Sequence, residues 1–207
     1  MPAVFLTADP HFGHEGICKF TYKDQFTGEE KKVRPFDNAA QMNDFMVTAW
    51  NETVRPNDKV YLLGDVAMRT KHLDDVMPLL HGDLVLIKGN HDIFKPNVYR
   101  KYFRDVRAYH VMNGCLLSHI PIHKSSIGRF GCNIHGHTHQ NQVVDVTYEI
   151  DPGDLKTRHR VVKVDPDYIC VSVEQTDFKP ILFEKVMTRI VDRGGQFGFR
   201  SVGERIM

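Results

Sequence analysis

Three short apolar runs stand out in the first half of the chain, and none of them alternates with polar residues. They are "AVFLTA" (3–8), "KVYLLG" (59–64) and "DLVLIKG" (83–89). Strands of a parallel sheet are buried on both faces and therefore read as continuous apolar runs. The pattern predicts three buried strands.

Helical periodicity separates these runs. Asn38 is a candidate N-cap, Gln41 is placed for a capping-box contact, and Pro56 lies beyond the expected end. Apolar residues recur between them at i, i+3, i+4, i+7 and i+8, which predicts core packing: Met42, Phe45, Met46, Ala49 and Trp50.

A second helix is expected over residues 71–80, where Pro78 should bend it or tighten its last turn. Its inward residues are Leu73, Val76, Met77 and Leu80. The first half thus reads βαβαβ, which implies parallel strands joined by right-handed crossovers.

The second half is richer in strands. The expected strands cover residues 105–112, 114–118, 132–135, 142–147, 160–164 and 168–174, and an amphipathic helix follows at 182–192. No linker divides the chain, so we expect one domain over residues 1–187 and a tail over 188–207 that is mobile or docks on a partner. In the polar loop 21–35, we expect Lys31, Lys32 and Arg34 to be solvated rather than functional.

Composition adds few constraints. A chain of 207 residues with a net charge of +1 is long enough for a substantial core and is not a strongly cationic nucleic-acid binder. The four cysteines form no C-x-x-C pair, and Cys115, Cys132 and Cys170 are expected to be buried, reduced thiols. No signal peptide or run of about 20 apolar residues is evident, so a cytoplasmic protein is expected.

Polar clusters follow the apolar runs, and many of the twelve histidines lie in them. Strand ends of open α/β sheets meet at one edge, so the clusters should converge. Carboxylates and imidazoles together suit divalent first-row metals. The clusters are Asp9-Pro10-His11, Gly64-Asp65, Gly89-Asn90-His91-Asp92, His119 and His135-Gly136-His137-Thr138-His139.

Taken singly, each cluster also fits an ordinary turn or an incidental histidine, because Asn and Asp favour turns. The occurrence of all five clusters in one chain, each directly after an apolar run, favours a metal site. Asp9 and His11, like His137 and His139, stand two apart and would point the same way from an extended segment. Pro10 favours such an extended conformation at Asp9.

These motifs together resemble the calcineurin-like metallophosphoesterase superfamily, in particular its small bacterial and phage-type members. The resemblance covers roughly residues 4–140, and the segment "VSVEQTDFKP" extends it to about residue 185. The resemblance implies a four-layer αββα sandwich of two mixed sheets flanked by helices. It also implies two divalent metal ions from among Mn, Fe, Ni, Co and Zn, with Mn favoured.

By the same resemblance, Asp9, His11 and His139 would hold one metal. Asn90, His119 and His137 would hold the other, and Asp65 would bridge them. His91 would be the catalytic histidine outside the ligand set, oriented by Asp92.

The activity implied is hydrolysis of a small phosphate ester, with a phosphodiester such as a nucleotide favoured, by attack of a hydroxide that bridges the two metal ions. Two alternatives stay open: a nuclease on DNA or RNA, which the lack of an interleaved aromatic and basic track disfavours, and an idle metal-binding protein. For His14, a contact to substrate or to the ligands and a purely structural hydrogen bond both stay open. For His123, a phosphate contact and a place in a surface loop both stay open. No membrane partner is expected, and the sequence leaves oligomeric state undetermined.

Overall fold

The computed structural model describes residues 2–200, and its first half has the expected βαβαβ order. Strands β1 (Val4–Thr7), β4 (Lys59–Leu62) and β5 (Asp83–Ile87) pair in parallel, with helices α1 (Ala39–Thr53) and α2 (Thr70–Val76) between them. β6 (Asp105–Arg107) extends the sheet in parallel beyond β5. β13 (Ile181–Leu182) adds an antiparallel edge beside β1, giving the order β13-β1-β4-β5-β6.

The ends of the two helices follow their local sequence. The side chain of Asn38 accepts the amide of Gln41 (2.9 Å), while the Gln41 side chain reaches back to the amide of Asp37 (2.7 Å). α2 gives way to the tighter 3₁₀ turn η2 (Met77–Leu79), whose central residue is Pro78. Phe45 departs from the prediction, because it is 48% exposed whereas the rest of the stripe lines the core or its margin.

The second sheet has the order β12-β9-β8-β7 and is also mixed. β12 (Tyr168–Cys170), β9 (Cys132–His135) and β8 (Cys115–Leu117) are parallel, and β7 (His110–Met112) is antiparallel to β8. The strand expected over 105–112 is therefore two strands in different sheets. The segment "DVRAYHVM" contains no glycine or proline that would mark a turn, so the sequence pattern does not indicate the change of sheet.

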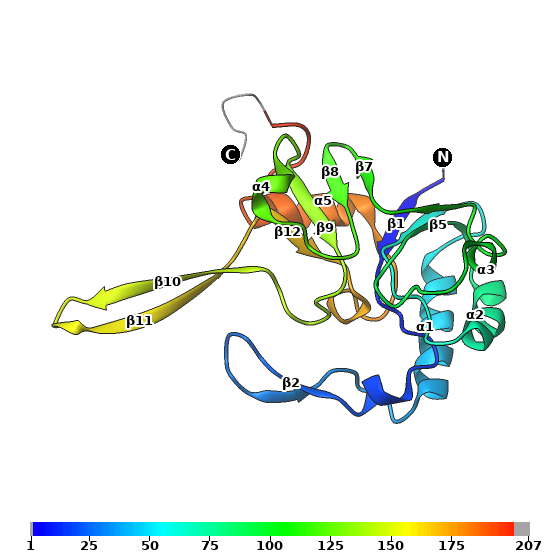
Figure 1. Cartoon of the computed structure of the whole chain (residues 1–207), viewed down its shortest axis with the longest axis horizontal. Coiled ribbons are helices and arrows are strands. Elements are labelled where there is room, and N and C mark those ends of the chain that lie inside the picture. Colours follow the sequence, from blue (N-terminus) through cyan, green and yellow to red (C-terminus); the bar gives the residue numbers. More distant parts are fainter. Residues whose placement is uncertain (1, 201–207) are drawn as a thin grey trace.

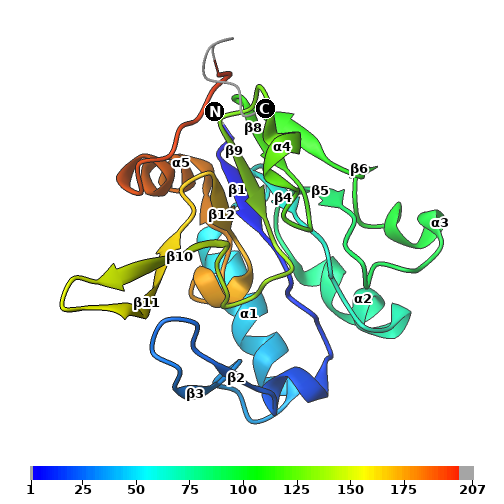
Figure 2. The same ribbon diagram turned by 60° about the vertical axis from the view of Figure 1, so that its left-hand side comes forward.

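The main apolar core lies on the two faces of the first sheet. Leu6, Leu63 and Val85 pack toward Leu117 and Ile134 of the second sheet. On the opposite face the first sheet packs against α1 and α2 (Figure 2). The fold is thus mixed α/β, with two mixed sheets and helices.

Helix α5 (Phe183–Asp192) contacts β1 and β13 of the first sheet and β12 of the second. Its buried residues Val186 and Ile190 belong to the core between the sheets. The outer face of the second sheet contacts the segment before α4 (Lys124–Ile127): Tyr168 Oη donates to the Ile122 carbonyl, and Asn133 accepts the Ile122 amide.

Two hairpins stand beside this body. β10 (Val144–Asp151) and β11 (Asp154–Val164) form a long ribbon that projects away from the sheets (Figure 1). The loop 21–35 forms a shorter hairpin, β2 (Thr21–Lys23) and β3 (Glu30–Lys32). Gln25 joins the two hairpin segments, because it exchanges two hydrogen bonds with the backbone of Gln142. The first half of the chain also contains two short helical segments, η1 (Glu15–Cys18) and α3 (Pro96–Tyr99).

The predicted tail divides into three parts. Residues 188–192 are the end of α5, so the expected boundary at 187 falls inside a helix. Residues 193–200 dock on the chain itself: Gly198 donates its amide to Asn113, and Arg200 binds two carbonyls and Asp167. Residues 201–207 lie outside the described residues.

All four cysteines are buried free thiols, as predicted for three of them. Among the helices of residues 2–200, none combines the length and the hydrophobicity that crossing a bilayer requires.

Candidate metal centre

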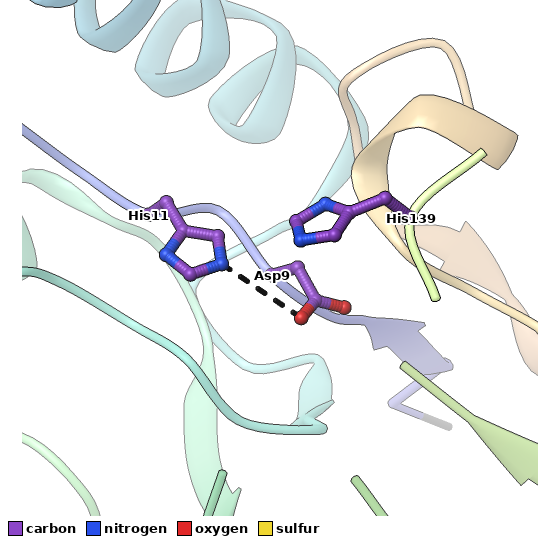
Figure 3. A group of neighbouring side chains, drawn as sticks. All are labelled: Asp9, His11 and His139. Atoms are coloured by element: carbon purple, nitrogen blue, oxygen red, sulfur yellow. Dashed lines mark ion pairs between the residues drawn. The ribbon is translucent and has the colours of Figure 1, made fainter. Parts of the chain in front are cut away.

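The loops that follow β1, β4, β5, β8 and β9 bring the predicted polar clusters together. Two groups of three side chains each offer one ligand atom, and within each group these atoms lie within 4.8 Å of one another. They are Asp9, His11 and His139 (Figure 3), and Asp65, His119 and His137.

Asp65 joins the two groups. Its Oδ2 lies 3.6 Å from Nε2 of His11 and 3.4 Å from Nε2 of His119. Asn90 completes the second group, since its Oδ1 is 2.8 Å from Nε2 of His119. The predicted ligand residues therefore form one continuous cluster.

The backbone at this cluster is unusual. Asp9, His11, Asp65, His137 and His139 all have positive φ, between 48° and 68°. Few non-glycine residues adopt this left-handed region, although Asp and His do so more readily than most, and such conformations concentrate at functional sites.

The expected extended geometry is wrong for both pairs of residues. His137 and His139 have φ angles of 68° and 52° and belong to different groups, so they do not point the same way. The first pair, Asp9 and His11, shows the cause. Their φ angles are 57° and 48°, while their amides bond to the carbonyls of Gly64 and Asp65, both at 3.0 Å. The loop after β1 is thus bound to the loop after β4, and these long-range bonds override the local preference that Pro10 imposes on Asp9.

Glycines allow the loops to approach one another. A Cβ at Gly136 would lie 2.5 Å from Oδ2 of Asp9, and one at Gly89 would lie 2.2 Å from Oδ1 of Asp65. Side chains at either position would displace a candidate ligand.

Hydrogen bonds set which ring nitrogen faces the cluster. Nδ1 of His119 lies 2.8 Å from the Leu63 carbonyl and Nδ1 of His139 lies 3.0 Å from Glu174. With Nδ1 donating to these oxygens, Nε2 is the nitrogen of each ring that would face a cation.

The pKa values of the first group are shifted in different directions. Burial lowers the pKa of His139, but its hydrogen bond to Glu174 and the charge of that carboxylate raise it above its usual value. Asp9 is fully buried, and burial raises the pKa of its carboxyl group to about 6. Burial and nearby Arg34 hold the pKa of His11 well below its usual value, so its ring is neutral. Oδ1 of Asp9 and both ring nitrogens of His11 are buried without a protein partner. Buried polar atoms are rarely left unpaired, and a bound divalent ion would satisfy Oδ1 of Asp9 and one of the two ring nitrogens of His11.

Asp92 does not orient His91 as expected. Its Oδ2 accepts the amides of Asp65 and Gly89 (both 2.8 Å), and its Oδ1 accepts the amide of Val66 (3.1 Å). Asp92 therefore holds the loops after β4 and β5 together. The difference arises because two of the three amides, those of Asp65 and Val66, belong to a loop 26 residues or more earlier in the chain, which the local sequence around Asp92 does not reveal.

His91 lies at the exposed rim of the cluster, with its ring centroid 5.5 Å from that of His11. Together with Asn90 and His137 it lines a cleft of about 220 Å³ over the candidate ligands. His14 also lines this cleft. His123 is exposed and caps α4 through Ser125, so it is not among the described residues that line the cleft.

Arg34 was expected to be solvated, and this is wrong: it is completely buried. Its guanidinium donates to the carbonyls of Asp9 (2.6 Å) and Pro10 (2.7 Å), and it pairs with Glu174 at 2.8 Å. Glu174, in the 3₁₀ turn η3 (Val173–Gln175), also accepts from His139. Burial alone would raise the pKa of Glu174, but Arg34 and His139 bring it down to about 2.

Sequence reasoning missed both residues of this buried pair, as well as Ser172, whose hydroxyl donates to Oδ2 of Asp9 (2.7 Å). The one available signal was "VSVEQTDFKP", which contains Ser172 and Glu174 but gives no indication of what they contact.

No family model matches the chain. The uncharacterized protein MJ1445 of Methanocaldococcus jannaschii is 30% identical to it over 199 residues, and the alignment covers 94% of each chain. The chain belongs to the family of MJ1445. The crystal structure of AQ665 from Aquifex aeolicus, a protein of unknown function, has a similar fold, with a TM-score of 0.60. That likeness covers 90% of this chain and 98% of AQ665 at 20% identity, so it shows the fold alone.

Proposed function

We propose that this protein is a metal-dependent phosphoesterase of the calcineurin-like metallophosphoesterase superfamily, acting on a small phosphate ester, with a phosphodiester preferred. One observation carries the proposal: two Asp/His groups from separate strand ends meet at Asp65, with ligand atoms of Asp9 and His11 buried and unpartnered.

In this proposal Asp9, His11 and His139 hold one divalent ion, with Mn favoured. Asn90, His119 and His137 would hold a second, and the carboxylate of Asp65, which lies between the two groups, would serve both. Such a pair of ions supplies a nucleophilic water at neutral pH and neutralises charge on the phosphate.

His91 has the position for proton transfer, since it is exposed at the rim of the cleft and its backbone amide is tied to Asp65 (2.8 Å). Hydrolysis forms a bond from water oxygen to phosphorus and breaks the bond from phosphorus to the ester oxygen. His91 would donate a proton to the departing alkoxide, and water gives up a proton to solvent. General-acid help of this kind contributes roughly 10²–10⁴-fold in rate.

The proposal includes the finer fold, a four-layer αββα sandwich in a cytoplasmic protein. α1 and α2 on the first sheet, and α4 with its preceding segment on the second, support the outer layers.

The test begins with protein stripped by EDTA and reloaded with Mn²⁺. We expect about two metal ions per chain by elemental analysis, and hydrolysis of bis-p-nitrophenyl phosphate that EDTA abolishes. Asp65→Asn should lower metal content, whereas Asp145→Asn on the projecting ribbon serves as the matched control. His91→Ala should lower the rate and leave metal content unchanged. Loaded protein that hydrolyses neither mono- nor diesters would overturn the enzyme assignment in favour of an idle metal-binding protein.

One observation favours a nuclease as the second candidate. On the projecting ribbon Tyr148 pairs with Arg160 and Ile150 pairs with Arg158, so an aromatic ring and two cations share one face. Stacking and phosphate contacts of this kind bind single strands. Cleavage of single-stranded DNA that exceeds hydrolysis of small diesters, and that Arg158→Ala reduces, would favour this alternative.

A further inference from the structure

The cleft over the candidate ligands is not isolated. A larger cavity of about 600 Å³ adjoins it, between the loop after β1, the start of α1 and the start of α2. His14 lines both spaces, and it is the one residue that the two linings share among those described. A molecule bound in both spaces would pass His14.

The His14 ring presents a defined hydrogen-bond donor. Its Nδ1 accepts the amide of Ile17 (3.1 Å), capping η1. An acceptor nitrogen carries no proton, so the proton of the neutral ring is on Nε2. The rings of His11 and Phe20 flank it edge-on, with centroids 5.7 and 5.8 Å away. No protein acceptor for Nε2 is found in residues 2–200.

The larger cavity has a mixed lining. Met68 and Ala40 provide apolar surface, and Glu15 and Asp75 provide carboxylates. Two cations also line it: Lys71 pairs with Asp75 at 2.7 Å, and Arg69 has no ion pair among the described residues. Its volume lies in the usual range for small-molecule sites. Because the two cations and two carboxylates balance, the lining does not select a second charged phosphate. A polar ring with donors and acceptors on its edge matches apolar surface bordered by both charges.

We propose that the larger cavity, here called the His14 cavity, binds a polar ring of nucleoside size that belongs to one of the two alcohol groups of a phosphodiester. His14 is then a substrate-binding residue at the boundary between this cavity and the cleft. This rests on the proposed function, because the phosphate of the same substrate would lie in the cleft over the candidate ligands. The Nε2–H of His14 donates to a phosphate oxygen, and the cavity selects the group beyond it.

The test measures binding separately from turnover. AMP and inorganic phosphate are titrated calorimetrically into Mn²⁺-loaded wild type, His14→Asn and Ala40→Trp. Asparagine is a good N-cap, so His14→Asn keeps the bond to Ile17 and removes the Nε2–H. Ala40→Trp fills the cavity, and Glu52→Trp, exposed near the other end of α1, is its control.

We expect His14→Asn and Ala40→Trp each to weaken AMP binding about tenfold. His14→Asn loses one hydrogen bond to a charged group, and Ala40→Trp loses the contact with the ring. For Ala40→Trp and Glu52→Trp, phosphate binding should match wild type. Unchanged AMP affinity in both variants would overturn the proposal, as would equal weakening of AMP and phosphate by Ala40→Trp. AMP binding that behaves as expected in a protein without hydrolytic activity would retain the cavity assignment and reject the proposed function.

Discussion

Replacing Arg34 by methionine tests whether the buried pair with Glu174 stabilises the site. Arg34 and Glu174 side chains are 0% and 3% exposed. Arg34→Met leaves the Glu174 carboxylate buried without its cation, and it leaves the carbonyls of Asp9 and Pro10 without a donor. Removing one partner of a buried ion pair costs about 3–5 kcal/mol.

In a domain of this size each kcal/mol lowers Tm by about 2–4 °C, so Arg34→Met should lower Tm by roughly 6–20 °C. Urea denaturation and thermal melts, both in EDTA, measure the effect without any contribution from metal. The control is Lys71→Met, which breaks an exposed pair with Asp75 and should cost less than about 0.5 kcal/mol.

The double variant Arg34→Met/Glu174→Gln identifies the cause. The neutral amide removes the unpaired charge, so the double variant should be more stable than Arg34→Met alone. An Arg34→Met protein as stable as the Lys71→Met control would refute the reasoning, and so would a double variant no more stable than the single one.

Three further predictions concern the same cluster. Gly136→Ala should lower metal content, because its Cβ would meet Asp9, whereas Gly153→Ala at the tip of the ribbon should not. The pKa of Glu174 is about 2 in the fold against an ordinary 4.5, so its stabilisation is complete above pH 4.5 and is lost as pH falls toward 2; Glu174→Gln should flatten acid unfolding curves over that range. Asp92→Ala should cost about 2–4 kcal/mol in urea melts and also lower metal content, because it frees buried amides, among them that of Asp65; normal metal content would contradict this role.

The central strands and helices could be predicted because each is a local property of the chain. β1, β4 and β5 are continuous apolar runs, and α1 has its cap at Asn38 and its stripe within one segment. The candidate ligands could be predicted for a related reason. Those that follow β1, β4 and β5 lie at parallel strand ends of one sheet, which must meet at one edge. Those that follow β8 and β9 join them only because the second sheet packs on the first.

The prediction failed where distant segments decide the outcome. The run 105–112 gave no sign that β6 and β7 belong to different sheets, and Pro10 gave none that Asp9 would adopt positive φ. Asp92 looked like a partner for its neighbour His91, yet its carboxylate binds amides of the loop after β4.

The sequence by itself determined the strand and helix segments of the first sheet and the residue types gathered at its strand ends. Only the tertiary structure decided that Arg34, in a polar loop, is buried against Glu174, 140 residues away in the chain. An arginine in a polar loop is solvated unless another segment provides a carboxylate and carbonyl oxygens that accept hydrogen bonds from its guanidinium. Whether these acceptors lie within reach of Arg34 depends on how η3 packs against the loop after β1, and no local sequence pattern indicates that packing.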